Sequence, residues 1–350
     1  MHKNYLKWAT VAACAVLTTS TWAQSLPKAN VQVVGAFSYL NATSSIERPF
    51  WTKTIPEASG GAITVDYTTL DQMGLSGSEI LRLMRNGTVS FASADLSYMA
   101  ADNTAFNALS LPGLLTDIQT ARKAADAYKP VLDGIMRKTY NSHLLMLWPA
   151  PPQVIYCKPK IDGLTSLSGK KVRVANRPQS IFVEQVGAVP VTLPATEAVP
   201  ALQRGTADCG ITGTLSGNTG KWAEVTDYLM PLNLGYAIWF QAVNVDRWNA
   251  LDKDVQAFLE KELGELENKL WANADLEAQD GINCNIGEGE CRFGSPQSMK
   301  LVDVSAQDQQ RLKEILKDEI LPDWAKSCSK TCVEAFNSTV GKVTHVEVMK

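Results

Sequence analysis

The chain contains 350 residues, 45% of them hydrophobic and 20% charged, with a formal net charge of −3 at pH 7. This length suffices for two lobes with separate cores. The slightly acidic balance disfavours nucleic acids and anionic membranes as partners, because both are bound through basic patches.

The first 23 residues have the features of a secretory signal peptide. Lys3 and Lys7 precede an apolar run, Trp8–Leu17, and a small-residue cleavage site, Thr21–Ala23, follows. A lipoprotein signal ending at Cys14 is the alternative, but cleavage there leaves an apolar core shorter than the roughly 7 residues required. No later run approaches the ~18 apolar residues of a membrane span. We therefore expect an exported protein without direct membrane insertion, whose mature net charge is −3 − 2 = −5.

Strands and helices alternate in the part of the chain that follows. The pattern predicts strands over Val31–Phe37, Ile63–Tyr67 and Phe91–Asp95, a helix over Ile46–Ala58, and a second helix that stops at Gly87. Asp95 stands at the carboxyl end of the third strand. Capping of the next turn is one explanation for an aspartate at that point.

A helical region around Asp117–Tyr140 is followed by Leu144–Tyr156, which starts apolar but contains three prolines. Proline within a central strand removes a hydrogen bond from the ladder. We therefore expect Leu144–Tyr156 to cross between two lobes as a hinge rather than to form a central strand.

The stretch Leu167–Thr212 carries the clearest pattern. It predicts a short strand through Arg173, a helix over Gln179–Val186, a strand over Val189–Leu193, a helix over Glu197–Arg204 and a strand over Ala207–Thr212. This order implies a parallel sheet with right-handed crossovers. Arg173 falls near the carboxyl end of its strand, where open α/β sheets bind ligands.

The same order of helix, Gly stop and strand occurs twice. Residues Glu79–Ala94 lie over Glu197–Thr212 at an offset of 118, with Glu, Gly and Thr coinciding at three positions. This repeat suggests two similar α/β lobes with a cleft between them, into which the carboxyl ends of the strands face.

The remaining elements are expected to complete both lobes. Leu234–Asn244 is predicted as a strand that returns to the first lobe, Ala250–Ala278 as a long amphipathic helix, and Ser305–Asp318 as a further helix. The segment Leu321–Trp324 contains a proline and predicts a break.

Six cysteines remain after the signal peptide, and an even number in an exported chain favours disulfides. Metal binding is the alternative, but the spacings are not those of a zinc site. Cys328 and Cys332 would lie on one helical turn, which makes a bridge between them unexpected. We therefore predict a Cys157–Cys209 pair and pairing between segments for the last four cysteines, which include Cys284 and Cys291.

The pattern in Leu167–Thr212 resembles the periplasmic solute-binding proteins (DctP-type) of tripartite ATP-independent periplasmic (TRAP) transporters. The matched residues are Gly169, Lys171, Arg173, Val174, Gly187, Ala188, Pro190, Val191, Pro194, Glu197, Ala201, Leu202, Gln203, Gly205 and Asp208. They keep order and spacing over about forty positions, and the likeness extends from Val31 to about Trp324.

The resemblance implies an α/β, two-lobe periplasmic binding protein fold. Each lobe is then a mostly parallel sheet flanked by helices, and a long C-terminal helix spans both lobes. We place the first lobe at residues 24–150 plus about 239–278, and the second at residues 151–238 plus about 279–345. Hinge segments connect them, and the ligand cleft lies between them.

The resemblance also implies site residues. A cleft-facing residue often stands where Asp95 does, so Asp95, Ser97 and Tyr98 become candidate contacts beside Arg173 and Asn176. Many relatives have a second arginine where this chain has Gln153, and an asparagine where it has Thr212. Both positions remain predicted contacts, although the polar site is then only partly present.

Aromatic residues near the cleft segments are candidate apolar walls, although large apolar side chains are buried by default. They are Trp148, Phe182, Trp222, Tyr236 and Trp239. With one firm cation and few polar groups, the sequence favours a monocarboxylate with an apolar or aromatic body, because a dicarboxylate or sugar acid would leave polar atoms unpaired.

The sequence lacks the motifs of common catalytic and cofactor sites, such as HExxH, GxSxG, a Walker loop or GxGxxG. We expect no catalysis, no cofactor and no metal. A carboxylate pair of Asp95 and Glu197 is the enzymatic alternative, but Glu197 lies in the first turn of a helix, where the dipole favours an acid.

A guanidinium matches a carboxylate with paired N–H donors, and the contact is strong when desolvated. Arg173 is therefore the predicted anchor, with a structural salt bridge as the alternative role. Together with the resemblance, this predicts a monomeric periplasmic receptor of a Gram-negative bacterium that binds a small organic acid and delivers it to membrane permease subunits. The alternative is an exported sensor or adaptor domain that signals through a partner.

Overall fold

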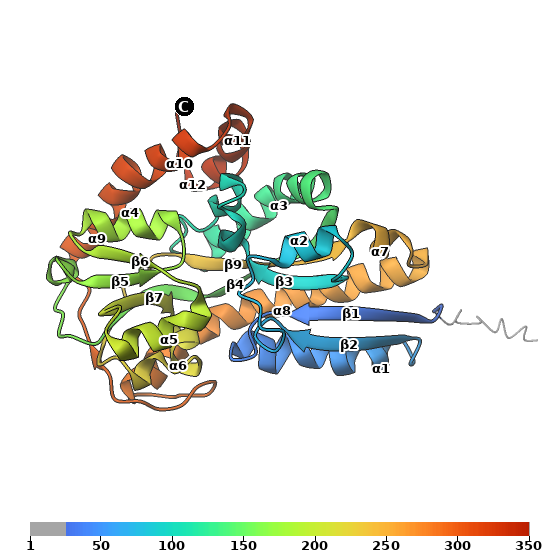
Figure 1. Cartoon of the computed structure of the whole chain (residues 1–350), viewed down its shortest axis with the longest axis horizontal. Coiled ribbons are helices and arrows are strands. Elements are labelled where there is room, and N and C mark those ends of the chain that lie inside the picture. Colours follow the sequence, from blue (N-terminus) through green and yellow to red (C-terminus); the bar gives the residue numbers. More distant parts are fainter. Residues whose placement is uncertain (1–25, 350) are drawn as a thin grey trace, which may run out of the picture.

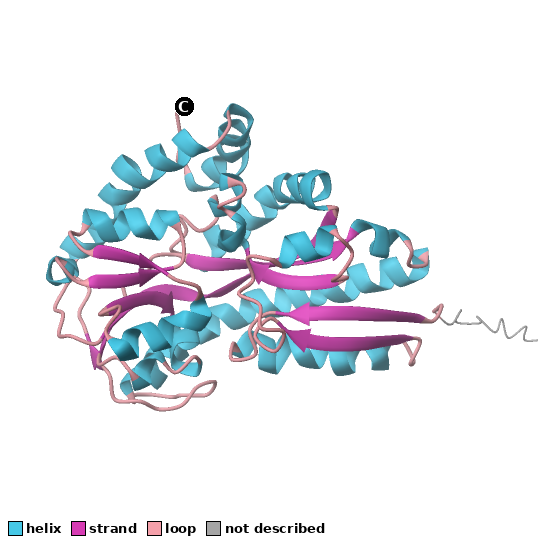
Figure 2. Ribbon diagram, viewed as in Figure 1, coloured by secondary structure: helices cyan, strands magenta, loops and turns pink. Residues whose placement is uncertain are grey.

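Two groups of parallel strands share one sheet in this computed structural model, which describes residues 26–349 (Figures 1 and 2). The predicted signal peptide lies outside the described residues. The strands run in the order β2-β1-β3-β9-β4-β7-β5-β6, and β8 and β10 pair off this path. The two-lobe α/β fold expected from the sequence is thereby confirmed.

The first lobe is built on β1 (Ala29–Gly35), β2 (Ile63–Thr69) and β3 (Phe91–Asp95), all parallel. Its helical segments begin with a helix of mostly π turns from Ala42 that ends in α1 (Ile55–Ala58), followed by α2 (Ile80–Arg85). The long helix α3 (Ile118–Tyr140) starts at Asp117, whose carboxylate accepts hydrogen bonds from the N–H groups of residues 119 and 120. These positions confirm the predicted strands to within two residues.

The second lobe repeats the arrangement. Its strands are β5 (Lys171–Val174), β6 (Val189–Thr192) and β7 (Cys209–Gly213), and its helices are α4 (Arg177–Gln185), α5 (Ala195–Arg204) and α6 (Thr214–Thr219). Strands β5, β6 and β7 are parallel, as the βαβαβ order predicts. Helix α5 ends at Gly205, whose φ of 72° is the left-handed conformation that favours glycine.

Strand β4 (Ser142–Cys157) corrects the predicted hinge. It is a central strand that pairs antiparallel with β9 (Tyr236–Asn244) in its first part and with β7 in its last part. The register against β9 shifts between Pro149 and Pro152, so the prolines fall where the ladder is already interrupted. The chain does cross between the lobes here, but within a strand.

The C-terminal helices pack against both lobes. Helix α8 (Lys253–Ile286) extends beyond its predicted end and runs along the sheet past both lobes (Figure 1). Its Trp271 indole donates to the carbonyl of Leu147 in β4 at 2.7 Å. The remaining elements are α7 (Val245–Asn249), α9 (Ala306–Ile315), α10 (Leu321–Ser327), α11 (Lys330–Phe336), α12 (Lys342–Thr344), β8 (Tyr228–Met230) and β10 (Lys300–Leu301). Helices α9 to α12 lie on one side of the molecule over α4 and α3 (Figure 1).

The predicted break at Leu321–Trp324 is wrong. Helix α9 continues through a π turn, Leu316–Ile320, directly into α10. Pro322 is the second residue of α10, directly after the π turn, so the proline falls where the helix already departs from regular α geometry.

The Cys157–Cys209 disulfide is confirmed and joins directly opposed residues of β4 and β7. The predicted pairing of the other four between segments is wrong, because Cys284 pairs with Cys291 and Cys328 with Cys332. Cys328 has an extended backbone between α10 and α11 rather than a place on a regular turn. The two Cα atoms are therefore 5.6 Å apart, within the usual range for a disulfide.

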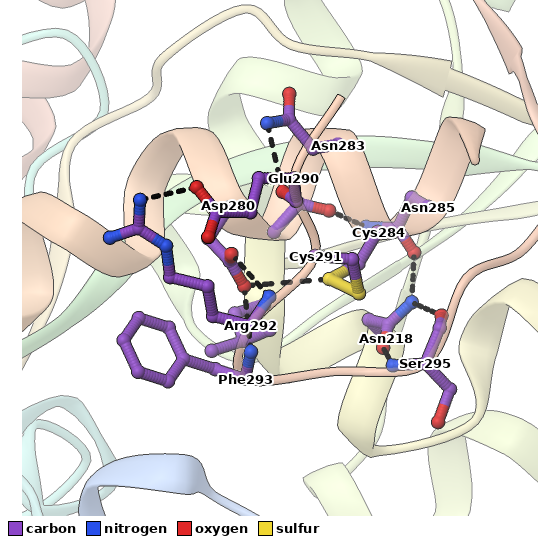
Figure 3. Close-up of a disulfide and its surroundings, with 12 residues drawn as sticks. Asn218, Asp280, Asn283, Cys284, Asn285, Glu290, Cys291, Arg292, Phe293 and Ser295 are labelled. Atoms are coloured by element: carbon purple, nitrogen blue, oxygen red, sulfur yellow. Dashed lines mark hydrogen bonds and ion pairs between the residues drawn. A yellow bond between two sulfur atoms is a disulfide. The ribbon is translucent and has the colours of Figure 1, made fainter. Parts of the chain in front are cut away.

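The Cys284–Cys291 bridge fastens the loop after α8 (Figure 3). The carboxylate of Asp280 accepts hydrogen bonds from the backbone N–H groups of Arg292, at 2.7 Å, and Phe293, at 3.1 Å. Asp280 and the two cysteines lie close enough together to resemble a set of metal ligands. The disulfide and these backbone contacts give the cluster a structural role instead.

Candidate ligand-binding cleft

Arg173 lies in the middle strand of the second lobe, with Val191 of β6 on one side and Gly210 of β7 on the other. The side chain is 3% exposed. Its Nε and Nη2 atoms donate to the carbonyl of Leu193, at 3.0 and 2.7 Å, and Nη1 donates to the carbonyl of Ile211 at 3.1 Å. Leu193 directly follows β6 and Ile211 lies in β7, so the backbone of the two neighbouring strands fixes the orientation of the guanidinium.

The Trp222 ring covers the same strand. Its centroid is 5.7 Å from the Arg173 guanidinium carbon, within the range of a cation–π contact. The approach requires Gly210, because a Cβ at that position would lie 2.6 Å from a Trp222 ring carbon. Trp222 is 4% exposed, so it serves as packing beneath the arginine.

Tyr98 of the first lobe reaches the arginine, and Tyr39 lies near enough to affect its ionisation. The Tyr98 hydroxyl is a hydrogen-bond partner of Arg173 and of the Ala195 N–H, both in the second lobe. Burial raises the pKa of Tyr98 to about 12, with a contribution from the Asp95 charge, and Arg173 opposes this rise. Burial likewise raises the pKa of Tyr39, which follows β1. Both phenols are therefore neutral at ordinary pH.

Arg173 is a buried cation without an anionic partner. Among residues 26–349 it forms no ion pair, and its contacts are carbonyls, phenols and an aromatic ring. Burial lowers the pKa of Arg173 from its ordinary value, and the nearby Tyr98, Tyr39 and Asp95 oppose that shift. The side chain remains charged, because arginine does not lose its proton in proteins.

Asp95 is the acidic group on the other side of the cleft. It is 6% exposed at the end of β3, and its Oδ1 accepts the Ser97 N–H at 2.8 Å. The Ser97 hydroxyl contributes a further hydrogen bond. Burial raises the pKa of Asp95 to about 6, against the opposing effects of Ser97 and Arg173. The capping role considered from the sequence is present, and the carboxylate also faces the cleft.

Two adjoining cavities mark the cleft. The larger has a volume of about 330 Å³ and is lined by residues of both lobes, among them Ser97, Tyr98, Asn107, Asn176 and Leu193. The smaller, of about 20 Å³, is lined by residues that include Asp95, Ser110, Gln153, Gln179 and Tyr236. A volume near 300 Å³ is the lower end of the range for small-molecule sites. The smaller one has room for about one water molecule.

A family comparison identifies the chain. The model of the DctP family, described as bacterial extracellular solute-binding protein family 7, matches residues 41–327. The chain belongs to this family. A solute-binding protein of Albidiferax ferrireducens is 27% identical over 160 residues, which are 45% of this chain and 46% of that protein. The chain thus spans about half the length of this relative.

Solved structures share the fold of this family member. A Bordetella pertussis extracytoplasmic solute receptor, DctP7, which binds pyroglutamic acid, superimposes with a TM-score of 0.79 at 20% identity, covering 89% of this chain and 99% of the other. A TRAP periplasmic solute-binding protein from Desulfovibrio salexigens with bound orotic acid gives a TM-score of 0.77 at 15% identity, covering 90% and 100%. At these identities the likeness shows the fold.

Most of the polar residues predicted for this family member's site meet at the cleft. Asp95, Ser97, Gln153 and Asn176 line the smaller cavity together with Tyr236. Asn176 caps α4 by accepting the Gln179 N–H at 3.1 Å, which fixes its orientation. Tyr98 lines the larger cavity and reaches Arg173.

Other predicted contacts lie elsewhere. Thr212 is half-buried in β7 and lines neither cavity. Phe182 and Trp239 also line neither cavity, because both are packed in the hydrophobic core. Trp239 stacks on Trp148 with ring centroids 5.4 Å apart. Glu197 is exposed on α5 and does not join Asp95 at a cavity, so the proposed carboxylate pair is not formed there.

The sequence interpretation missed Tyr39, Asn107, Ser110 and Gln179. Tyr39 follows the carboxyl end of β1 as Asp95 ends β3, so the strand-end rule identifies it. Asn107 ends a short 3₁₀ helix, Thr104–Asn107, and Ser110 follows it, so neither lies in an element long enough to show a periodic pattern. In the described part of the chain, no helix is both long and apolar enough to cross a bilayer.

Proposed function

We propose that this protein is an extracytoplasmic receptor that binds a small organic acid in the cleft, with Arg173 holding the carboxylate. One observation carries the proposal. A guanidinium 3% exposed to solvent has carbonyl and phenol partners but no carboxylate partner among residues 26–349. Buried charges in proteins are normally paired, so an anionic ligand supplies what the protein leaves out.

The donor geometry supports a carboxylate. Three of the five guanidinium N–H groups point to the carbonyls of Leu193 and Ile211, which leaves one on each terminal nitrogen. The Tyr98 hydroxyl is a partner of the guanidinium at the edge that carries these two remaining N–H groups. Two adjacent N–H donors match the two oxygens of a carboxylate. The ligand therefore replaces or joins the Tyr98 hydroxyl at this edge.

The cavities indicate that binding involves motion of the lobes. The space beside Asp95 holds about 20 Å³, so an acid placed between Asp95 and Arg173 requires the lobes to stand further apart. Tyr98 bridges them in the present arrangement by reaching Arg173 and Ala195. Opening to admit the ligand and closing over it would remove water from the carboxylate and strengthen its contacts.

The structure revises what is expected of the part of the ligand beyond its carboxylate. Phe182 and Trp239 were expected as apolar walls, but they pack in the core, and Tyr236 is the member of that set that lines the cavity. The proposal therefore keeps a small monocarboxylate and gives up the large aromatic tail. Relatives of the same fold bind pyroglutamate and orotate, which are organic acids of this size.

We further propose that the receptor is a periplasmic monomer, released by cleavage of the signal peptide, that delivers the bound acid to membrane permease subunits for ion-coupled uptake. Its membership of an extracellular solute-binding family is consistent with this role. Membrane vesicles containing the cognate permease would take up the acid only when the receptor is added.

A thermal-shift screen of small organic acids on the purified mature protein, followed by calorimetry, tests the proposal. Wild type and Arg137→Ala should bind the same acid equally, because Arg137 is exposed on α3 and pairs there with Asp133. Arg173→Ala should lose at least several hundred-fold in affinity, equivalent to several kcal/mol. Unchanged affinity in Arg173→Ala would refute the proposed role.

A further inference from the structure

The cleft contains a second buried charge that the carboxylate anchor does not use. Asp95 is 6% exposed, and among residues 26–349 it forms no ion pair. Arg173 affects its ionisation from a distance, but the two groups are not in contact as an ion pair. The site thus holds a buried cation and a buried anion that do not neutralise each other directly.

The hydrogen bonds of Asp95 leave it with spare acceptor capacity. Its partners are the N–H and the hydroxyl of one residue, Ser97. An ionised carboxylate offers about four acceptor sites, so about half remain for a ligand.

Two neighbouring groups also lack a partner. The amide oxygen of Asn107 and the hydroxyl oxygen of Ser110 are buried without a hydrogen bond among the described residues. Asn107 lines the larger cavity and Ser110 the smaller, and the two cavities share Ser97, Ala175 and Asn176. The first-lobe side therefore presents acceptors on Asp95 and Asn107 and a hydroxyl on Ser110 that can donate or accept, whereas the Arg173 guanidinium lies in the second lobe and lines neither cavity.

We infer that the ligand is an acid that also carries an N–H donor: its carboxylate meets Arg173, and its N–H group meets Asp95. This inference rests on the proposed function and specifies the ligand class of the same site. It favours amino-acid-like acids, either with an ammonium or with an amide or lactam N–H, over carboxylates whose bodies contain only carbon and oxygen. A site built to accept a hydrogen bond discriminates strongly against the analogue that lacks the donor, because its acceptor is then left unpaired.

Pairs of acids that differ at one ring atom test this directly in the wild-type protein. One pair is 5-oxopyrrolidine-2-carboxylate and 5-oxotetrahydrofuran-2-carboxylate, in which O replaces N–H. The other is pyrrolidine-2-carboxylate and tetrahydrofuran-2-carboxylate. The first pair presents a neutral N–H and the second an ammonium, so their order tells which form the site takes. Calorimetry should show at least one N–H acid binding at least 10-fold more tightly than its oxygen counterpart, or about 1.4 kcal/mol.

Substitution of Asp95 supplies the reciprocal test. In Asp95→Asn the amide oxygen can keep the Ser97 N–H bond, which places the NH₂ group where the carboxylate faced the ligand. The asparagine NH₂ group then faces the ligand N–H, and two donors cannot bond each other. The preference for the N–H acid over its oxygen counterpart should therefore fall below 3-fold or reverse. Asp66→Asn, on the exposed side of β2, should keep the wild-type preference.

The outcomes separate this inference from the function on which it rests. Equal binding of the members of both pairs by wild type would overturn the inference and leave a carboxylate receptor in place. Failure of all four acids to bind would also overturn it, and the wider screen with Arg173→Ala would then judge the receptor role. A preference for N–H acids that survives in Asp95→Asn would show that another group accepts the N–H.

Discussion

The two lobes have the same strand order, but each carries its buried charged residue at a different strand position. In the first lobe Val34 of β1 pairs with Ala92 of β3, and in the second lobe Arg173 of β5 pairs with Gly210 of β7. Ala92 and Gly210 correspond in the repeat at an offset of 118, so the cation of the second lobe stands where the first has Val34.

The reverse holds at the ends of the third strands. Asp95 ends β3, and Gly213 ends β7 at the corresponding position. A Cβ at Gly213 would lie 3.0 Å from the carbonyl oxygen of Pro151 and 2.9 Å from the Ser216 hydroxyl, which leaves little room for a side chain. Each lobe thus contributes one charge that the other lobe lacks, and the cleft combines two opposite charges rather than repeating one.

The largest expected effect tests the second-lobe side. Arg173→Lys should lower affinity for the bound acid by at least about 100-fold, because an ammonium keeps the charge but cannot hold both the Leu193 and Ile211 carbonyls and present paired donors. Calorimetry measures it, and Arg137→Lys on the exposed face of α3 is the matched control. Affinity within 3-fold of wild type would show that charge alone suffices.

The second-largest expected effect is on the free energy of unfolding and tests Asp95 of the first lobe. The pKa of Asp95 is raised from 3.8 to about 6 in the folded protein, so below about pH 4 both states are protonated and above about pH 6 the folded state holds a buried charge. Its contribution to stability therefore falls as pH rises between these values. In the ligand-free protein, Asp95→Asn should raise the free energy of unfolding by about 2 to 3 kcal/mol at pH 8.

Denaturant unfolding of wild type and Asp95→Asn from pH 4 to 8 measures this difference, which should vanish toward pH 4. Asp117→Asn is the control of opposite sign, because hydrogen bonds from Thr120 and its neighbours lower the pKa of Asp117. Its carboxylate therefore stabilises the fold throughout pH 4 to 8, and Asp117→Asn should lower the free energy of unfolding by a similar amount across that range, because the stabilisation is lost only below it. A pH-independent difference for Asp95→Asn would mean that Asp95 titrates normally.

The sequence predicted the parts of this site that follow from periodicity. Strand and helix order placed Arg173 and Asp95 at strand ends, and the offset between Glu79–Ala94 and Glu197–Thr212 indicated two equivalent lobes. What it missed depends on tertiary packing. Whether Phe182 faces a cavity or the core depends on the rotation of α4 against the sheet, and its sequence neighbours do not determine that.

Local exceptions caused the other errors. Proline rules argue against Leu144–Tyr156 as a central strand, but an interrupted ladder between Pro149 and Pro152 removes the conflict. A four-residue spacing argues against a Cys328–Cys332 bridge only if the helix is continuous, and it is not. In both places one or two residues leave regular geometry, which the average pattern of the surrounding sequence does not reveal.

The smallest expected effect concerns the contact between the two sides. Tyr98 belongs to the first lobe, but its hydroxyl reaches Arg173 and the Ala195 N–H of the second. If the hydroxyl joins Arg173 in holding the bound carboxylate, Tyr98→Phe should weaken binding about 10-fold, since one hydrogen bond to a charged group contributes about 1.5 kcal/mol. Tyr128→Phe, which removes a hydroxyl bonded to Ala105 inside the first lobe, should leave affinity unchanged. If Tyr98→Phe instead binds more tightly, the hydroxyl competes with the ligand for Arg173, and the cation is then held by the protein's own phenol until the acid displaces it.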